Sequence, residues 1–306
     1  MKIYQTKIVN AFTSEPFSGN AAGVVLDARG LNDAKMQLIA REMKHSETAF
    51  ILPASSSRAD VQIRWFTPAT EVPLCGHATI GAFHALAEDG LFGMKKAGTY
   101  SFKLQTKSGL LPIVVEKKYS GNVVEFGLPT PRFSQLKNLP AFFLRSLGLR
   151  PSDIDKRIPI VSDRYLYLPV RKLSTLHKLR PDFQSLDAAC RKLKIEAVCV
   201  MSLQTIEESS AIHSRFFAPT LGIQEDPVTG SANGPLGLYL YYYVLPKGYP
   251  IPLIWLPDGR IEFIGEQGDV LGRKGRVKIR VNVKKDVESI SIAGEAVTVM
   301  SAFINV

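Results

Sequence analysis

Apolar positions follow a helical spacing and then a strand spacing, and this order occurs once in each half of the chain. In the first half, Leu31, Leu38, Ile39 and Met43 fall on one helical stripe, with Asn32 or Asp33 as the expected cap. Apolar and β-branched runs then predict two strands, and a small-residue turn precedes a second helix. The predicted first-half elements are helix 34–44, strands 48–52 and 61–66, helix 79–88, and strands 109–116 and 123–126. Their second-half counterparts are helix 185–195, strands 198–203 and 211–217, and helix 233–242.

The same residues recur as well as the same pattern. Residues 46–68 align without a gap with residues 197–219, so that the Arg-Trp-Phe-Thr-Pro of 64–68 matches the Arg-Phe-Phe-Ala-Pro of 215–219. We therefore expect an α+β fold of two pseudosymmetric tandem domains, each a central helix wrapped by a mostly antiparallel sheet. The expected domains are residues 1–128 and 129–306, and the return of the last strand to the first domain is left open.

Composition and charge narrow the class of protein. The chain has 306 residues, 45% of them hydrophobic and 22% charged, as in an ordinary globular protein. Lys and Arg outnumber Asp and Glu by 38 − 28 = 10, which favours an anionic partner. Such a partner is nucleic acid, an acidic membrane surface or a small carboxylate. The basic residues form no continuous block of the kind that marks a nucleic-acid tail, and a solvated basic surface accounts for most of them. We therefore expect a small anionic substrate, and neither nucleic acid nor membrane as a partner. Binding of nucleic acid remains an alternative that rests on the charge alone.

Motifs for the common cofactors are missing from the sequence. It contains no Gly-x-Gly-x-x-Gly fingerprint and no Gly-x-x-x-x-Gly-Lys-Ser/Thr phosphate loop. The five His and the three cysteines, Cys75, Cys190 and Cys199, show no zinc spacing and no disulfide framework. We therefore expect no cofactor, no metal and a reducing, cytoplasmic compartment.

Two turns that each open a helix are candidates for anion binding. Gly76 and Gly230 occupy matching positions, and the free N–H groups of a helix start attract a carboxylate. Paired domains commonly bind ligands in the cleft between them, so two such starts predict a carboxylate site there. The alternative for either glycine alone is an ordinary tight turn.

Candidate catalytic residues stand where the two halves differ. Glu47 matches Val198, so only the first half offers a carboxylate between a helix and an apolar strand, where burial raises a pKa toward neutrality. His77 matches Ser231, and Asp226 lies in an insertion that only the second half has. The alternatives are a solvated or ion-paired Glu47, a structural His77 and a plain Asp-Pro turn at Asp226.

At these residues the sequence resembles the PhzF family, the phenazine biosynthesis-like isomerases with a diaminopimelate-epimerase-like fold. The motifs that carry the resemblance run through nearly the whole chain in the family's order, although Asn10, Ala21 and His45 depart from the common pattern. They are Phe12-Thr13 with Pro16-Phe17-Ser18-Gly19-Asn20, Ser46-Glu47-Thr48-Ala49-Phe50, Arg64-Trp65-Phe66-Thr67-Pro68, Glu71 to Thr79, Glu225 to Ala232, and Gln267-Gly268 with Gly272-Arg273-Lys274-Gly275.

The resemblance implies cofactor-free acid/base chemistry, commonly in a homodimer. In the phenazine branch of the family, the enzyme moves a proton between ring carbons of a dihydro-hydroxyanthranilate. The family's general acid/base glutamate falls on Glu47, and its supporting residues fall on His77, Asp226 and Ser231. The expected substrate-binding positions are Gly19, Asn20, Gly76, Ala78, Gly230, Ser231 and Ala232.

Two alternatives to this isomerase remain open. A member of the same fold can bind a ligand or a protein without catalysis, although the four intact residues favour an enzyme. Amino-acid epimerases of this fold use one thiol in each half, and the corresponding positions here are Cys75 and Thr229. A threonine has no accessible thiolate, which argues against epimerisation by two thiols.

Overall fold

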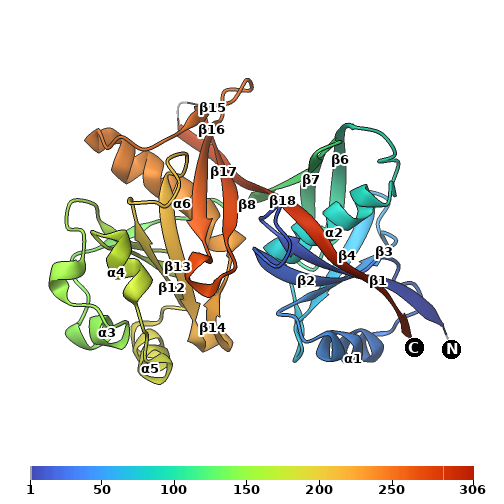
Figure 1. Cartoon of the computed structure of the whole chain (residues 1–306), viewed down its shortest axis with the longest axis horizontal. Coiled ribbons are helices and arrows are strands. Elements are labelled where there is room, and N and C mark those ends of the chain that lie inside the picture. The colour runs from blue at the N-terminus through green and yellow to red at the C-terminus, as the bar shows by residue number, and fades with distance from the viewer. Residues whose placement is uncertain (1, 285) are drawn as a thin grey trace. The chain divides into compact units, whose positions relative to one another are not determined.

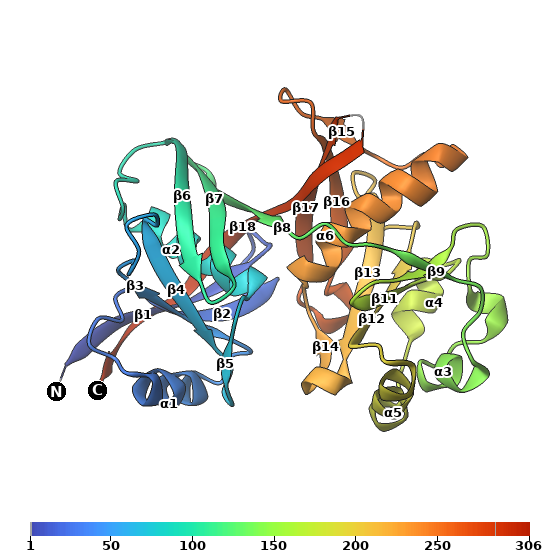
Figure 2. The same cartoon turned by 180° about the vertical axis from the view of Figure 1, so that it is seen from behind.

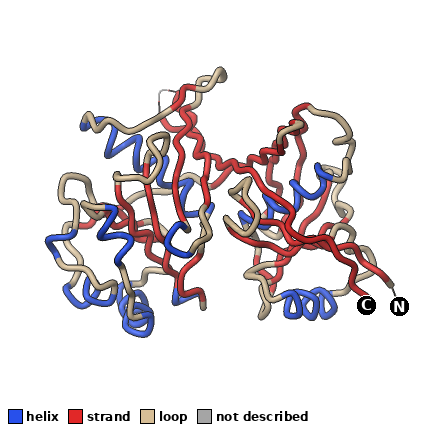
Figure 3. The backbone as a smooth tube through the Cα atoms, in the orientation of Figure 1, coloured by secondary structure: helices blue, strands red, loops and turns tan. Residues whose placement is uncertain are grey.

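The computed structural model of the chain describes residues 2–284 and 286–306 and divides the chain into two units (Figure 1). The first unit holds the residues up to Gly127 together with Ser291–Val306, and the second unit holds Leu128–Ile290. The long strand β18 (Asp286–Asn305) therefore begins in the second unit and ends in the first. Strands make up much of both units (Figure 3).

In the first unit a closed ring of strands surrounds one helix, α2 (Gly76–Glu88) (Figure 1). Around the ring the order is β1, β2, β3, β4, β6, β7, β8 and β18, and β18 pairs back with β1. The strands are β1 (Ile3–Ala11), β2 (Asn20–Val25), β3 (Thr48–Leu52), β4 (Val61–Phe66), β5 (Glu71–Val72), β6 (Gly98–Thr106), β7 (Gly109–Lys118) and β8 (Gly121–Leu128).

The ring corrects the fold expected from the sequence. We expected a mostly antiparallel sheet wrapped on a helix. Most strand pairs are antiparallel, with β2–β3 and β4–β6 as parallel exceptions, but the strands close into a ring instead of forming a simple sheet on a helix. The repeating pattern of apolar residues predicts each strand but not its partner, because closure depends on β18, which is far from β1 in sequence. What holds is a mixed sheet with helices.

Helices lie on the inside and the outside of the ring. Every residue of α2 from His77 to Ala87 is buried, and Gly81 lets the helix approach Val9, which would lie 3.4 Å from an added Cβ. Outside, α1 (Asp33–Met43) is capped by Asn32, whose side chain accepts from the Lys35 N–H at 3.0 Å. The apolar side chains of α1 pack against Phe50 and Phe66 and form a separate hydrophobic cluster with them.

The second unit is a β-sheet with helices on both faces. The strand order in this sheet is β9, β10, β11, β12, β13, β16 and β17, with β14 paired to β13 and β15 to β16. Its strands are β9 (Ser134–Leu136), β10 (Ile160–Ser162), β11 (Tyr165–Pro169), β12 (Ala197–Ser202), β13 (Ile212–Ala218), β14 (Ile223–Asp226), β15 (Ile254–Trp255), β16 (Ile261–Gln267) and β17 (Gly275–Lys284). Its helices are α3 (Ala141–Ser146), α4 (Leu173–Lys178), α5 (Phe183–Leu193) and α6 (Gly230–Tyr239), which a π-helical turn, Leu240–Val244, continues. Short 3-10 turns cover Pro151–Asp153, Pro219–Leu221, Leu245–Lys247 and Asp269–Leu271.

Alternate residues of the strands face different helices. Leu166 and Leu168 of β11 join the core that α3, α4 and α5 cover, whereas Tyr165 packs edge-on against Phe216 at 5.0 Å. The helix α6 lies along β16 and β17 (Figure 2), where Gly237 would place a Cβ 2.5 Å from Ile279. This contact explains why the helix carries a glycine there.

The same Arg–Glu fork recurs in both units. On β4, Arg64 donates from Nε and Nη2 to the two carboxylate oxygens of Glu71 at 2.7 Å each. On β13, Arg215 makes the same two bonds to Glu225 at 2.8 Å each. The Arg64 guanidinium holds the pKa of Glu71 below its usual value. Each fork thus ties a strand to the loop that leads into the unit's buried helix.

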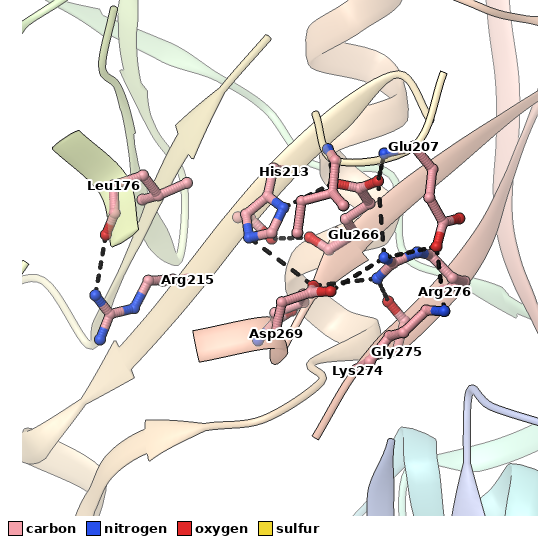
Figure 4. A network of polar contacts seen from close by, with 12 residues as sticks. Leu176, Glu207, His213, Arg215, Glu266, Asp269, Lys274, Gly275 and Arg276 are labelled. Carbon is pink, nitrogen blue, oxygen red and sulfur yellow. Dashed lines mark hydrogen bonds and ion pairs between the residues drawn. The ribbon is translucent and has the colours of Figure 1, made fainter. Parts of the chain in front are cut away.

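A buried charge network joins β13 and β16 in the second unit (Figure 4). His213 and Glu266 are fully buried register partners, and His213 Nδ1 lies 2.7 Å from Glu266 Oε2. Burial alone would raise the pKa of Glu266, but hydrogen bonds from His213 and from the Ile206 and Glu207 N–H groups lower it to about 2. Arg276 then bridges Glu207 and Asp269. The network fixes the loop after β16.

Among the residues that the structure describes, none of the helices combines the length and the apolar character that crossing a membrane requires.

Burial of His84 inside the ring predicts a pH-dependent loss of stability. Neither of its ring nitrogens has a hydrogen-bond partner among the described residues, and burial lowers its pKa to about 4. Because an unfolded histidine titrates near 6.5, only the unfolded chain gains this proton as the pH falls from about 6.5 to about 4. The free energy of unfolding should therefore fall by up to about 3 kcal/mol over that range, with no such contribution above it.

Urea denaturation of the wild type and of His84→Leu at pH 7 and pH 4.5 measures this effect. The variant should lose less stability on acidification than the wild type. An equal loss in both proteins would show that other groups cause the acid sensitivity.

Candidate active site

The start of α2 carries the chemical groups of the first unit. The helix begins at Gly76, three residues before the predicted 79, so His77 and Ala78 lie in its first turn and Cys75 is the N-cap residue. Thr79 fixes this turn, since its hydroxyl donates to the Cys75 carbonyl at 2.6 Å. The side chains of Cys75 and His77 are both nearly buried.

His77 is held by side chains from two other parts of the first unit and by the cap residue of its own helix. Its Nδ1 lies 3.3 Å from Asn20 Nδ2, and its Nε2 lies 3.2 Å from Ser46 Oγ. With the Asn20 amide donating, Nδ1 accepts and the proton of the neutral ring sits on Nε2. Cys75 Sγ adds a contact 3.5 Å from Nδ1. The proton-bearing nitrogen therefore faces the residues just before β3.

Glu47 lies at that point, between α1 and β3. Its backbone carbonyl accepts from the Gly23 N–H at 3.1 Å, which fixes the residue against β2. Its side chain is only 13% exposed, and Oε2 lies 3.3 Å from His77 Nε2. The two atoms are within ion-pair distance but are not aligned as a hydrogen bond, and Oε2 has no hydrogen-bond partner among the described residues. A buried carboxylate oxygen with spare acceptor capacity is suited to take up a proton.

Gly19 and Asn20 join this group at the start of β2. Gly19 has a φ of +61°, and an added Cβ would lie 2.2 Å from the Ala11 carbonyl oxygen, so the turn requires glycine. The turn delivers the buried Asn20 side chain to His77.

A second polar group precedes α6 in the second unit. Asp226 ends β14, and its Oδ2 accepts from Thr229 Oγ1 at 2.5 Å. Gln267 holds both residues, because its Nε2 donates to the Asp226 carbonyl at 2.8 Å and its Oε1 accepts from the Thr229 N–H at 3.0 Å. The next residue, Gly268, has a φ of +91° and would place a Cβ 2.7 Å from the Pro227 carbonyl oxygen. The loop is thus fixed by groups from the end of β16.

Ser231 lies in the first turn of α6, which begins at Gly230 rather than at the predicted 233. Its hydroxyl is 3.3 Å from Tyr165 Oη. Both side chains line a cavity of about 120 Å³ together with Arg164, Tyr167, Leu128 and Pro131. The cavity has room for one small polar group.

The structure thus divides the predicted site residues into two groups. Glu47, His77, Asn20, Gly19, Gly76 and Ala78 belong to the first unit, and Asp226, Gly230, Ser231 and Ala232 belong to the second. Glu47, His77 and Asn20 are brought into contact, although up to 57 positions separate them. In the second unit, Asp226 precedes Thr229 in the sequence and Ser231 follows it. The two side chains contact different partners, Thr229 for Asp226 and Tyr165 for Ser231.

Four further residues take part that the prediction of the site omitted: Ser46, Cys75, Gln267 and Tyr165. Ser46, Cys75 and Gln267 lie within the motifs that carry the family resemblance, and this position is the one sign in the sequence that they belong to the site. Tyr165 lies outside the quoted motifs.

The chain is similar to known proteins along nearly its whole length. The family model described as phenazine biosynthesis-like protein matches residues 9–302. An uncharacterized isomerase of Clostridium acetobutylicum is 35% identical over 98% of this chain and 97% of its own length. The trans-2,3-dihydro-3-hydroxyanthranilate isomerase of Pseudomonas aeruginosa is 30% identical over 94% of both chains. The crystal structure of a PhzF-family phenazine biosynthesis protein of Bacillus anthracis superposes with a TM-score of 0.86 at 33% identity and covers 100% of both chains.

The contact between Thr229 and Asp226 predicts a role for the threonine hydroxyl as a positioning group. The sequence indicated only that no thiol chemistry runs through Thr229, yet its hydroxyl orients a predicted catalytic carboxylate. Thr229→Val keeps the shape but removes the hydrogen bond to Asp226 and the one that Gln267 Nε2 donates to the hydroxyl at 3.1 Å, so it should weaken ligand binding by about tenfold. Thr229→Ser keeps the donor and should bind like the wild type. Titration calorimetry with a bound substrate or product checks this, and equal affinity in Thr229→Val would contradict it.

Proposed function

The chain belongs to the phenazine biosynthesis-like protein family and is an isomerase, and we propose that it moves a proton on a small carboxylate-bearing substrate with Glu47 as the general acid and base. The observation that carries this proposal is the buried Glu47 Oε2, which lies 3.3 Å from His77 Nε2 and has no hydrogen-bond partner among the described residues. An acceptor that folding leaves unused can accept a substrate proton.

In the proposed reaction the Glu47 carboxylate removes a proton from one carbon of the substrate. The electrons of the broken C–H bond form a new C=C bond, and the existing double bond shifts along the conjugated system. The protonated Glu47 then returns the same proton to the carbon at the far end of that system. The substrate and product have the same composition, so the cycle needs no oxidant and consumes no water.

His77 supports Glu47 in this scheme. The N–H on Nε2 lies beside the carboxylate that must gain and lose a proton, and its direction is set by Asn20 on the other nitrogen. Ser46 limits rotation of the ring from the same side.

Substrate binding is assigned to the two helix starts. The N–H groups of Gly76, Ala78 and Gly230 would attract a carboxylate, because they lie at the N-terminus of a helix of ten or more residues. The N–H of Ala232, which we also expected to bind substrate, donates to the Thr229 carbonyl at 3.2 Å instead. Asp226 and Ser231 would bind polar groups such as an amine or a hydroxyl. The net charge of +10 would raise the local concentration of an anionic substrate.

An epimerase with one thiol in each half is less consistent with these contacts. Cys75 occupies one of the two thiol positions, but the other holds Thr229, whose hydroxyl is used by Asp226. A non-catalytic role is disfavoured because the buried Oε2 of Glu47 lies against the buried His77, whereas a binding protein has no need of an unsatisfied carboxylate oxygen.

Replacing Glu47 tests the proposal. The Pseudomonas relative is named for trans-2,3-dihydro-3-hydroxyanthranilate, so this compound is the first substrate to try. Glu47→Gln keeps the size of the side chain and should lower kcat by about 10²–10⁴ while leaving the folded state intact. Glu42→Gln, an exposed change at the end of α1, is the matched control and should retain wild-type kcat.

Proton nuclear magnetic resonance in deuterated water gives the second measurement. The wild type should exchange a substrate C–H proton with solvent, unless transfer is faster than exchange from Glu47, and Glu47→Gln should not. If this compound is not turned over, the same exchange assay is run on other unsaturated carboxylates. Full activity of Glu47→Gln on any substrate would reject the mechanism.

The family resemblance also predicts a homodimer. Of the tyrosines that follow Pro235, Tyr239 is buried and donates to the Pro159 carbonyl at 2.7 Å, so it packs the core, whereas Tyr242 is about half exposed. Light scattering at micromolar concentration should give twice the chain mass of 33.7 kDa. A mass equal to that of one chain would reject the dimer.

A further inference from the structure

Three different metal-ligating side chains meet beside Glu47. The ligand atoms of Glu47, Cys75 and His77 all lie within 4.8 Å of one another. Their spacing in sequence is not a zinc motif, because two come from the start of α2 and the third from the residue before β3. Among the described residues this is the one group of at least three His, Cys, Asp and Glu side chains with such spacing.

The distance between the glutamate and the histidine is that of a tetrahedral site, and the thiol lies close by. Zinc with ordinary bond lengths holds sulfur and nitrogen ligands about 3.6 Å apart and nitrogen and oxygen ligands about 3.4 Å apart. Here Glu47 Oε2 lies 3.3 Å from His77 Nε2, whereas Cys75 Sγ lies 3.9 Å from Nε2 and 3.5 Å from Nδ1. The cysteine side chain must therefore turn to another rotamer, toward the Nε2 side of the ring, for all three atoms to bind one ion.

The surroundings also suit a metal ligand. Glu47 Oε2 is buried and has no hydrogen-bond partner among the described residues, so it has lone pairs to offer. The second ring nitrogen of His77 faces Asn20, and a ligating histidine usually donates its other N–H to such a neighbour. Turning the Asn20 amide end for end would present its oxygen to that N–H.

We propose that Glu47, Cys75 and His77 bind one Zn²⁺ ion, and that the bound ion inhibits the isomerase by occupying the carboxylate that moves the substrate proton. Binding releases the thiol proton of Cys75 to solvent and moves the imidazole proton from Nε2 to Nδ1, while water fills the fourth position. One thiolate, one imidazole and one carboxylate favour Zn²⁺ over Mg²⁺ or Ca²⁺, which prefer oxygen ligands only. The metal site is independent of the proposed function, but the inhibition rests on it.

Cobalt titration of the metal-free protein tests the site without a substrate. Co²⁺ replaces Zn²⁺ in tetrahedral sites and reports a thiolate ligand by a charge-transfer band in the near ultraviolet. The wild type should bind one Co²⁺ per chain with this band, and one equivalent of Zn²⁺ should abolish it, whereas millimolar Mg²⁺ should not. Absence of the band in the folded wild type would overturn the proposal.

Variants locate the ion. Cys75→Ser should lose the band, and both Cys75→Ser and His77→Gln should weaken Zn²⁺ binding by at least the roughly 10- to 100-fold typical of losing an outer partner of a metal ligand. The matched controls are Cys190→Ala and His84→Gln, which change a buried cysteine and a histidine outside the group and should keep both the band and the affinity. A band that survives in Cys75→Ser would place the ion elsewhere and reject the site.

Activity separates this proposal from the proposed function. Zn²⁺ at one equivalent should inhibit the active wild type, and a chelator should restore turnover. Full activity of Glu47→Gln would reject the acid/base role and leave the cobalt result valid. A cobalt band together with uninhibited turnover would reject the inhibition.

Discussion

The Arg–Glu fork before each buried helix is the contact on which the geometry of both polar groups depends. In the first unit, Arg64 on β4 donates two hydrogen bonds to Glu71 on β5, and a short loop then connects β5 to α2. The same strand pairs with β3 so that Thr48 lies opposite Phe66. Glu47, the residue before Thr48, and His77, in the first turn of α2, are therefore both positioned from one strand.

The fork is strong because several effects act on the same two side chains. Arg64 is 16% and Glu71 11% exposed, so solvent screens the pair little, and the planar guanidinium matches both carboxylate oxygens. The guanidinium also lies over the Phe66 ring, 5.2 Å from its centroid. Arg215 repeats this with Glu225 and with Phe217 at 5.0 Å, and its Nη1 also donates to the carbonyls of Leu176 and Leu179 at the end of α4.

Local elements could be predicted from the sequence because their signals are local. The strands 48–52 and 61–66 have the predicted bounds, and Asn32 caps α1 as its position before an amphipathic run suggests. Helix starts were predicted three residues late in both halves, at 79 and 233. Small residues at Gly76 and Gly230 look like turn residues in sequence, but in the fold burial of the whole helix outweighs their weak helix propensity.

Contacts between distant segments could not be read in the same way. Ring closure depends on β18 pairing with β1, and a repeating pattern of apolar residues does not specify the partner of a strand. The neighbours of His77 show the same limit. Asn20, Ser46 and Cys75 come from a turn, a helix–strand junction and a helix cap, and only the fold makes them one group. A spacing rule for zinc motifs would likewise miss the site that we propose, because Glu47 lies far in sequence from Cys75 and His77.

The two halves use one framework for different chemistry, and the differences lie in a few side chains. Both halves have the Arg–Glu fork. Both also have an asparagine or aspartate that caps the start of the outer helix, α1 or α5, and a left-handed lysine that ends it, Lys44 or Lys194. Glu47, Cys75 and His77 in the first half stand opposite Val198, Thr229 and Ser231 in the second. The first half thus holds a carboxyl, a thiol and an imidazole, each of which can gain or lose a proton, whereas the hydroxyls of Thr229 and Ser231 donate and accept hydrogen bonds. A repeat that kept both thiols would favour proton exchange from two sides. Under the proposed function, the arrangement in this chain, with one thiol position holding Thr229 and a carboxylate at Glu47, leaves one group to remove the proton and to return it.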